Sequence, residues 1–420
     1  MLHILVNAYA VSPTWGSEPG MGWNWVTALA RYCRVTVITE GEWRREIEAA
    51  LAALPQRANL RFVYSPVPPR VRRMCWNQGD WRFYWHYRRW QRRTLRLARQ
   101  IVASEHVDAI HQLNMIGFRE PGFLWQIKDV PFVWGPVGGM ELVPQAYAHG
   151  EPVTGRLKVT MKNALNDVQR RFQPRVRKAL RRVDAVLAAT KGVQEAMARF
   201  HHMQVELMNE TGCYATPDVP PRKHHAETFD ILWVGKFDFR KQLVLALRVV
   251  AALPGRERVR LHVVGSGTDA EEAKYRRLAH ALCLDGTVVW HGKVAHGQVL
   301  QLMQDASLFL FTSIMEGTPH VVLEAVQSCL PVVCFDACGQ AGVVTNEIGV
   351  KIPLSTPSQS VGDFAKAIGP LMTHPDRLER MRAACPARQK ALSWDSKARR
   401  MVEIYNDIVN KYSQTHHYED

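Results

Sequence analysis

The most informative segment of the chain is Glu316-Gly317-Thr318-Pro319-His320-Val321-Val322-Leu323-Glu324. Thr318 is a suitable N-cap for a helix, and Pro319 suits the first helical position, where the missing N–H of proline costs little. The apolar residues that follow predict a buried helix. Glu316 is then expected just before this helix, and Glu324 about a turn and a half inside it.

The start of this predicted helix is a candidate anion site. The first amides of a helix have no intrahelical acceptor, and the helix dipole adds partial positive charge there. We expect phosphates near the amides of His320, Val321 and Val322, while Glu316 and Glu324 bind different parts of one elongated polar ligand. A sugar nucleotide has this shape and charge. The alternative is a capped structural helix with two surface glutamates.

Short apolar runs alternate with longer helical patterns along the chain, which predicts parallel-sheet α/β architecture. Strands are expected in the first half at His3–Ala8, Val35–Thr39, Arg61–Tyr64, Asp108–Gln112, Pro131–Val137 and Ala185–Thr190. They are expected in the second half at Phe229–Gly235, Val259–Gly265, Thr287–His291, Ser307–Thr312, Pro331–Phe335 and Gly349–Pro353. Two Rossmann-like domains, with a cleft between them, account for this pattern most simply.

A proline-rich, aperiodic segment at 213–228 predicts the linker between the halves. The expected units are residues 1–215, residues 216–395 and a closing segment, 396–420, with a final helix at about Ser396–Lys411. The length of 420 residues suits two domains, because single cores rarely grow beyond about 250–300 residues.

Positive and small residues follow several of the predicted strands in the second half. Lys236, Arg240 and Lys241 come directly after one strand, where a parallel sheet binds ligands, and indicate a clamp for a diphosphate. Gly265 ends the next strand, and Val294 follows the one after it. A solvated basic turn is the alternative for the three cations.

The first half offers weaker signals of the same kind. Gly16 opens a glycine-rich loop between the first strand and a helix, although its spacing does not fit a dinucleotide fingerprint. His111 is expected at the ligand-facing end of a strand, beside the wall formed by Gly135–Gly139. A lone histidine of this kind is more often structural, and a glycine-rich segment is often only a tight turn.

Charge is unevenly distributed. The net charge is +15, and residues 1–215 contribute +13 of it, from 30 Lys and Arg against 17 Asp and Glu. Residues 70–99 contain ten arginines interleaved with aromatic residues, and residues 170–182 contain seven Lys and Arg. We expect these two stretches to meet an anionic membrane surface, since arginine with tryptophan and tyrosine suits the bilayer interface. RNA stacking and a solvated helix with a packed aromatic face are the alternatives.

No apolar run is long enough to span a bilayer, and the start of the chain is interpreted as a buried strand, not a signal peptide. Eight scattered cysteines without CxxC spacing indicate reduced thiols in a cytosol, with neither a disulfide framework nor a zinc site. A cytoplasmic protein at the inner face of the plasma membrane is expected.

With these motifs assembled, the chain resembles the family-four retaining glycosyltransferases of GT-B architecture, and within them the bacterial exopolysaccharide enzymes. The likeness is strongest over Gly235–Lys241 and over Glu316–Glu324, which matches the family's E-x7-E motif. It implies a donor on the second domain, an acceptor on the first, and a last helix that crosses back onto the first domain. One departure is visible, because Gln242 stands where many members have glycine.

The resemblance also implies roles for single residues. Glu316 would bind donor-sugar hydroxyls, Glu324 the ribose, and Lys236 and Lys241 the diphosphate, while His111 would lie near the transferred sugar. Together the motifs and the resemblance give catalytic residues His111, Lys241 and Glu316. They give as donor-binding residues Gly16, Lys236, Arg240, Lys241, Gly265, Val294, Glu316, Gly317, Thr318, His320, Val321, Val322 and Glu324.

The expected activity is retaining transfer of a hexosyl group from a UDP- or GDP-sugar to a saccharide acceptor, lipid-linked, in bacterial surface polysaccharide biosynthesis. The family needs no metal or other cofactor, and the chain has no DxD motif. Nucleic acid is not expected as a partner. Two other functions remain open: a GT-B sugar-nucleotide epimerase, and a basic RNA- or membrane-binding protein with a vestigial cleft.

Overall fold

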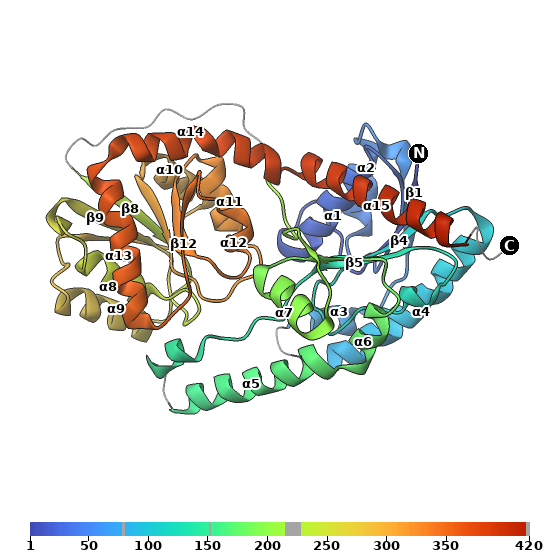
Figure 1. Ribbon diagram of the computed structural model, residues 1–420, viewed down its shortest axis with the longest axis horizontal. Helices are drawn as coiled ribbons and strands as arrows, with labels where there is room; N and C mark the ends of the chain where they lie inside the picture. Colours follow the sequence, from blue (N-terminus) through green and yellow to red (C-terminus); the bar gives the residue numbers. More distant parts are fainter. Residues whose placement is uncertain (78–79, 151–152, 215–227, 417–420) are drawn as a thin grey trace.

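The computed structural model describes residues 1–77, 80–150, 153–214 and 228–416. They form two Rossmann-like α/β domains, each built on a parallel sheet with helices on both faces (Figure 1). The two sheets share one strand order. Counted along the chain within each domain, the strands lie side by side as third, second, first, fourth and fifth. This order reverses direction beside the first strand, and open parallel sheets bind ligands at that point.

The first sheet runs in the order β3-β2-β1-β4-β5-β6-β7 in the described residues. Its strands are β1 His3–Ala8, β2 Arg34–Thr39, β3 Leu60–Tyr64, β4 Ala109–Asn114, β5 Phe132–Val137, β6 Ala185–Ala188 and β7 Glu206–Leu207. Its helices are α1 Ser17–Leu29, α2 Arg44–Ala52, α3 Pro69–Trp76, α4 Arg82–Ser104, α5 Val153–Phe172, α6 Pro174–Leu180 and α7 Lys191–His201. The central strands β1, β4 and β5 are buried throughout, as expected for a sheet covered on both faces.

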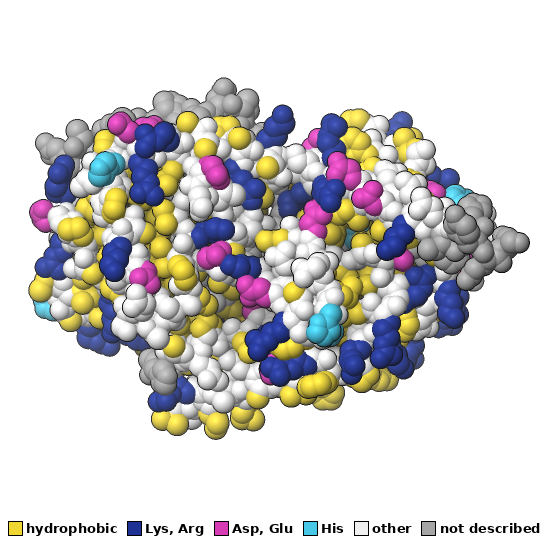
Figure 2. Space-filling view, viewed as in Figure 1, with side chains coloured by type: hydrophobic (Ala, Val, Ile, Leu, Met, Phe, Trp, Pro, Cys, Tyr) yellow, Lys and Arg dark blue, Asp and Glu magenta, His cyan; other side chains and the backbone are white. Residues whose placement is uncertain are grey.

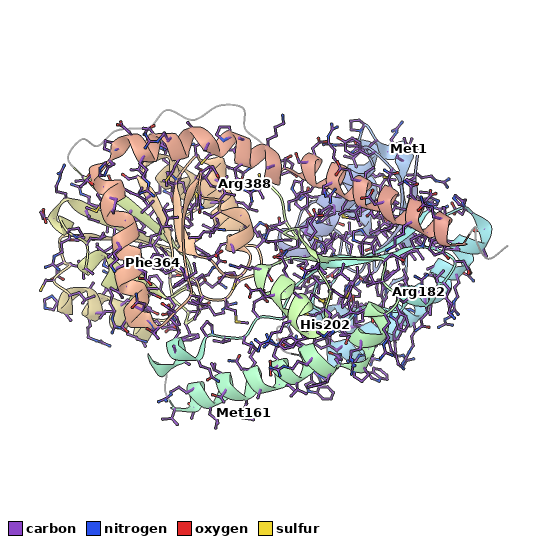
Figure 3. All side chains as sticks on the ribbon, viewed as in Figure 1. Met1, Met161, Arg182, His202, Phe364 and Arg388 are labelled. Carbon is purple, nitrogen blue, oxygen red and sulfur yellow. The ribbon has the colours of Figure 1, made fainter. Side chains whose placement is uncertain are left out.

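The second sheet runs in the order β10-β9-β8-β11-β12-β13. Its strands are β8 Phe229–Val234, β9 Val259–Val264, β10 Val288–Gly292, β11 Leu308–Phe311, β12 Val332–Phe335 and β13 Gly349–Ile352. Its helices are α8 Leu243–Ala251, α9 Asp269–Ala281, α10 His296–Asp305, α11 His320–Gln327, α12 Gln340–Val343, α13 Pro357–Thr373 and α14 Pro375–Leu392. Phe364 of α13, labelled in Figure 3, packs edge-on against Phe335 of β12 with ring centroids 4.9 Å apart.

The last helix, α15 (Trp394–His416), lies on the first domain. Figure 1 shows α14 and α15 following one another along one side of both domains. Trp394 meets the ring of Trp25 on α1 at 5.8 Å, and Tyr405 is completely buried in the same cluster. Most of the expected linker lies outside the described residues. At the start of this linker, Cys213 is buried. Its backbone forms an isolated parallel β-bridge with Ser393, at the junction of α14 and α15.

Each strand expected from the sequence is present, with ends shifted by a few residues at most. The main difference is β4, which continues to Asn114, so that His111 lies in the middle of the strand and not near its end. The two-residue strand β7 has no counterpart in the expected set. Figure 2 shows the cations of the first domain gathered along its lower side, over α4 to α6.

Candidate active site

The carboxyl ends of β8 and β9 are joined by a contact that only glycine permits. Gly265 has φ +136°, and a Cβ atom there would lie 1.8 Å from the carbonyl oxygen of Gly235. Any larger residue would push the Gly235–Lys241 loop out of place. The two glycines therefore set the backbone from which the predicted diphosphate cations project.

Lys241 and Glu316 meet where the sheet changes direction. Lys241 follows β8 and Glu316 follows the neighbouring β11, and Lys241 Nζ lies 2.7 Å from Glu316 Oε1. The Ser313 hydroxyl donates to the same carboxylate oxygen at 2.7 Å. The side chains of Lys241 and Glu316 are 16% and 15% exposed, so this ion pair is mostly buried but keeps some accessible surface. The structure brings these two predicted residues together.

The other two predicted cations lie differently. Arg240 Nη2 is 3.0 Å from Asp238 Oδ2, so part of its charge is used within the loop. Burial lowers the pKa of Arg240, but the hydrogen bond with Asp238 and the negative charges of Asp238 and Glu316 together outweigh burial, so the pKa is raised. Lys236 is exposed. Gln242, the departure noted from the sequence, has φ +53°, a left-handed conformation that glycine adopts more easily, and its side chain donates to the Phe239 carbonyl at 2.7 Å.

The predicted start of α11 was wrong by one residue. Pro319 is the N-cap with extended backbone, and the helix begins at His320. Val322 N–H donates to the Pro319 carbonyl at 3.0 Å, so it is not one of the free amides. The amides that precede the first bond of the helix are those of His320 and Val321, and these two remain as the candidate phosphate site.

Thr318 does not cap the helix, because the helix begins two residues later and the Thr318 hydroxyl oxygen accepts from Asn209 Nδ2 at 3.0 Å. The Thr318 N–H donates to Glu210 Oε1 at 2.7 Å, and its hydroxyl donates to Glu210 Oε2 at 2.5 Å. Glu210 belongs to the segment that follows β7 of the first domain, and Asn209 beside it donates to the Gly339 carbonyl at 3.1 Å. These bonds tie the first domain to the Glu316–Glu324 segment, and the sequence analysis did not find them.

Glu324 lies on α11, four residues after its first residue, His320. Its carboxylate is 3.1 Å from Nε2 of His296, at the beginning of α10, and its side chain is 25% exposed. Val294, two residues before His296, is half-buried against a hydrophobic core of the second domain. Glu324 is thus available to a ligand and separated along α11 from Glu316. Gly16 is exposed and is the N-cap residue of α1, on the first domain.

The predicted position of His111 at the ligand-facing end of a strand is wrong, because the residue lies in the middle of β4. The side chain is completely buried. Its Nδ1 is 2.6 Å from the Tyr405 hydroxyl of α15, and its Nε2 is 2.7 Å from the Gly135 carbonyl. Both ring nitrogens are therefore used in holding α15 against the sheet, which is a structural role.

We expect His111 to control stability in acid. Burial lowers its pKa to about 4, below its ordinary value of 6.5, and the bond to Gly135 only partly opposes this. Between these pH values the unfolded chain carries the proton and the folded chain does not. The free energy of unfolding should therefore fall as the pH falls through this window, by about 3 kcal/mol in all.

Urea unfolding of His111→Gln and of the parent at pH 7 and pH 5 measures this effect. The variant should lose less stability than the parent on acidification. His280→Gln, at a side chain that is 80% exposed, is the control and should behave as the parent does. Equal losses in the parent and in His111→Gln would contradict the assignment.

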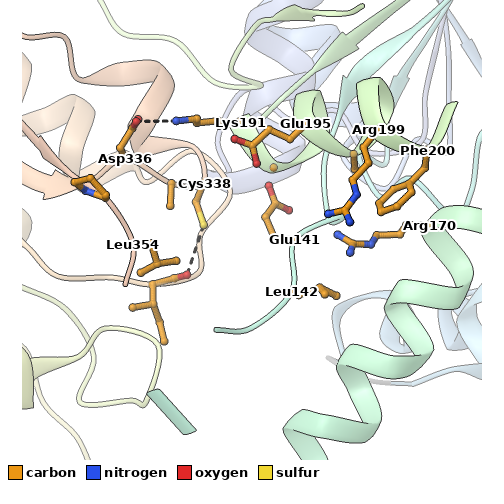
Figure 4. A pocket seen from close by; sticks show the side chains of 15 residues that line it. Glu141, Leu142, Arg170, Lys191, Glu195, Arg199, Phe200, Asp336, Cys338 and Leu354 are labelled. Atoms are coloured by element: carbon orange, nitrogen blue, oxygen red, sulfur yellow. Dashed lines mark hydrogen bonds and ion pairs between the residues drawn. The ribbon is translucent and has the colours of Figure 1, made fainter. Parts of the chain in front are cut away.

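A cavity of about 400 Å³ lies between the domains (Figure 4). The first domain lines it with Glu141, Arg170, Lys191 and Arg199, among others, and the second with Ile314, Asp336, Cys338 and Leu354. Lys191 Nζ closes one side by pairing with Asp336 across the domains at 2.7 Å. Burial raises the pKa of Glu141, and the Thr190 hydroxyl opposes this. Both acidic and basic groups thus face this cavity, and neither Lys241 nor Glu316 is among its lining residues.

The described residues contain no group of three or more His, Cys, Asp or Glu side chains placed to hold a metal ion. In the same part of the chain, no helix is both long and apolar enough to cross a bilayer.

Comparison with known sequences identifies the second domain. The family model of group 1 glycosyl transferases matches residues 218–388. The D-inositol 3-phosphate glycosyltransferase of Streptomyces griseus is 25% identical over 197 residues, 44% of this chain and 41% of the relative. The lipopolysaccharide 1,6-galactosyltransferase of Escherichia coli is 30% identical over 137 residues, 31% of this chain and 36% of the relative. The chain thus matches less than half the length of either curated relative.

Solved structures match almost the whole chain. The apo form of the lipopolysaccharide outer core galactosyltransferase WaaB has a TM-score of 0.60 at 14% identity, covering 98% of this chain and 99% of that one. Anabaena Alr3699/HepE in complex with UDP has a TM-score of 0.56 at 12% identity, covering 97% and 100%. At such identities the likeness establishes the fold. The chain thus has the two-domain GT-B fold, and its residues 218–388 match the family of group 1 glycosyl transferases.

Proposed function

We propose that this protein is a glycosyltransferase that moves a hexosyl group from a UDP- or GDP-sugar to a saccharide acceptor, with retention of anomeric configuration. The observation that carries the proposal is the Lys241–Glu316 pair at the switch point of the second sheet, beside the amides of His320 and Val321. A cation, two amides and a carboxylate suit a diphosphate joined to a sugar. The Anabaena neighbour solved with UDP supports a nucleoside diphosphate as part of the ligand.

In this proposal the second domain, 216–395, binds the donor and the first, 1–215, binds the acceptor. Lys241 neutralises the charge that develops on the departing phosphate, and Glu316 holds hydroxyls of the transferred sugar. The acceptor hydroxyl attacks from the face that the phosphate leaves, and the phosphate oxygen takes its proton. The protein contributes position and fixed charge. We propose no metal ion, because Lys241, Arg240 and the helix amides supply positive charge.

We also propose that the acceptor is lipid-linked and that the enzyme acts in bacterial surface polysaccharide synthesis, at the inner face of the plasma membrane. The lipopolysaccharide galactosyltransferases among the relatives and the excess positive charge of the first domain support this. An epimerase would share the cleft but would convert a UDP-sugar to its epimer without any acceptor.

A screen of UDP- and GDP-sugars by thermal shift and by hydrolysis tests the donor. One nucleotide series should raise the melting temperature of the parent, and Lys241→Gln should lose most of that rise because the diphosphate loses its cation. The anomeric configuration of the product, read by NMR, tests retention. Inversion, epimer formation without acceptor, or no shift with any nucleotide would each contradict the proposal.

A further inference from the structure

Helix α5 carries its apolar residues on the outside. The six large ones are between 56% and 77% exposed: Val153, Leu157, Met161, Leu165, Val168 and Phe172. Their spacing of three and four residues places them on one face of the helix. Figure 3 labels Met161 at the lower edge of the molecule, and Figure 2 shows apolar side chains along that edge. We call these six residues the α5 stripe.

The inner face of the same helix is polar. Its buried residues are Asn163 and Asn166 in the described part of the chain. Asn163 exchanges hydrogen bonds with the backbone of Val143, at 2.7 and 2.9 Å, and Asn166 donates to the Glu141 carbonyl at 2.7 Å. A helix on the surface of a water-soluble domain normally turns its apolar face inward. The polarity of α5 is therefore inverted, and its exposed face suits an apolar phase.

The charges beside the stripe are positive. Arg156, Lys158 and Lys162 are exposed on α5. The one acid of the helix, Asp167, is paired with Arg170 and Arg171 at 2.5 and 2.7 Å. Helix α6 continues this surface with exposed Arg177 and Lys178, followed by exposed Arg181 directly after the helix.

Helix α4 adjoins the same surface through the loop at Arg119 and Glu120. Arg119 donates to Asn166 of α5, while Glu120 accepts from Arg88 of α4 at 2.9 Å and from Arg175 of α6 at 2.8 Å. Arg88 and Arg175, which belong to the two stretches expected to meet lipid, are thus paired with Glu120 within the protein. Tyr84 and Trp85, about one turn before Arg88, are 46% and 54% exposed, and add aromatic side chains of the kind found at bilayer interfaces.

We propose that α5 lies flat in the interface of a bilayer that contains anionic lipid, with its stripe among the acyl chains and its cations at the headgroups. Its 20 residues extend over about 30 Å. A second copy of the chain is the less favourable occupant. A two-fold contact through α5 would place Arg156, Lys158 and Lys162 near their own copies, and these like charges would repel.

This membrane contact would bring a lipid-linked acceptor to the enzyme. To that extent the inference rests on the proposed function. Arg170 of α5 lines the cavity between the domains and donates to the Met140 carbonyl at 3.2 Å. One helix would then bind the membrane with one face and border the cavity with the other. A saccharide held at the bilayer surface by a lipid would meet the cavity without leaving the membrane.

Flotation with two kinds of vesicle tests the proposal: pure phosphatidylcholine, and phosphatidylcholine with phosphatidylglycerol. The parent should float with the anionic vesicles. The triple variant Leu157→Gln, Met161→Gln, Leu165→Gln should bind them at least about tenfold less, since three apolar side chains no longer enter the interface. Thr154→Gln with Thr160→Gln, at exposed polar positions of the same helix, is the matched control and should float as the parent does. Replacing Arg156, Lys158 and Lys162 by Gln should remove the preference for anionic vesicles.

Circular dichroism and the nucleotide-induced thermal shift of the triple variant show that its fold and donor site are intact. They also separate the two proposals, because a wrong donor assignment removes the shift but not flotation. Flotation of the triple variant equal to that of the parent would overturn the inference. So would a parent that fails to float, or a dimer in sedimentation that the triple variant makes monomeric.

Discussion

Glu316→Gln should lower kcat/KM by about 10²–10³, the typical effect of removing one group that acts on the transition state. The carboxylate holds Lys241 Nζ at 2.7 Å and accepts from the Ser313 hydroxyl. An amide of the same size keeps the shape but removes the charge that positions the lysine and binds the sugar hydroxyls. Steady-state rates with the donor found by screening measure the loss.

The control is Glu257→Gln, the same change at an exposed acid of the second domain, which should keep parental rates. Urea unfolding should give similar midpoints for both variants, because the Glu316 side chain is partly open to solvent. Near-normal turnover by a folded Glu316→Gln enzyme would remove Glu316 from the site.

A double variant shows whether Glu316 acts through Lys241. If the carboxylate serves only to place the lysine, adding Lys241→Gln to Glu316→Gln should cost nothing beyond the larger single effect. If Glu316 also binds the sugar, as proposed, the double variant should be slower than either single one. The comparison separates sugar binding from support of the diphosphate cation.

The two sheets could be predicted because their strands are short apolar runs separated by glycine, proline and polar residues. The meeting of Lys241 with Glu316 followed from the same pattern, since the ends of neighbouring parallel strands share one edge of a sheet. The position of α15 on the first domain came from the resemblance to a family, and the burial of Trp394 and Tyr405 shows what holds the helix there.

His111 was misplaced for a physical reason. The polar residues after Ile110 suggested that the histidine lay near the end of the strand and faced a ligand. In the structure they are buried and paired across the sheet: Gln112 Oε1 accepts from Asn7 Nδ2 at 2.8 Å, and His111 meets Tyr405. The partner of His111 lies 294 residues away in sequence, so no local pattern could predict it.

Glu210 was missed because its surroundings carry no local signal. It follows a two-residue strand, and its partner Thr318 is 108 residues away. The inverted polarity of α5 was missed as well. Apolar residues at helical spacing normally indicate a buried face, and only the bonds of Asn163 and Asn166 show which side of the helix faces inward.

Glu210→Ala should lower the free energy of unfolding by about 3 kcal/mol, near the lower end for breaking a buried charged contact. Glu210 is 8% exposed and accepts from both donors of Thr318, which is also buried. Burial lowers the pKa of nearby Lys397 to about 8, and Glu210 opposes this. Removing the carboxylate leaves the N–H and the hydroxyl of Thr318 without their acceptor. It also removes a negative charge that stabilises the buried ammonium of Lys397.

The same substitution should reduce activity, because Glu210 joins the first domain to the segment that carries Glu316. Glu206→Ala, four residues earlier, is the matched control: it breaks a surface pair with Arg400, and such pairs contribute about 0–1 kcal/mol. Urea unfolding and steady-state rates of the two variants decide the matter. If Glu210→Ala is as stable and as active as Glu206→Ala, the Thr318 bonds do not hold the domains in register, and the Glu316–Glu324 segment takes its position from the second domain alone.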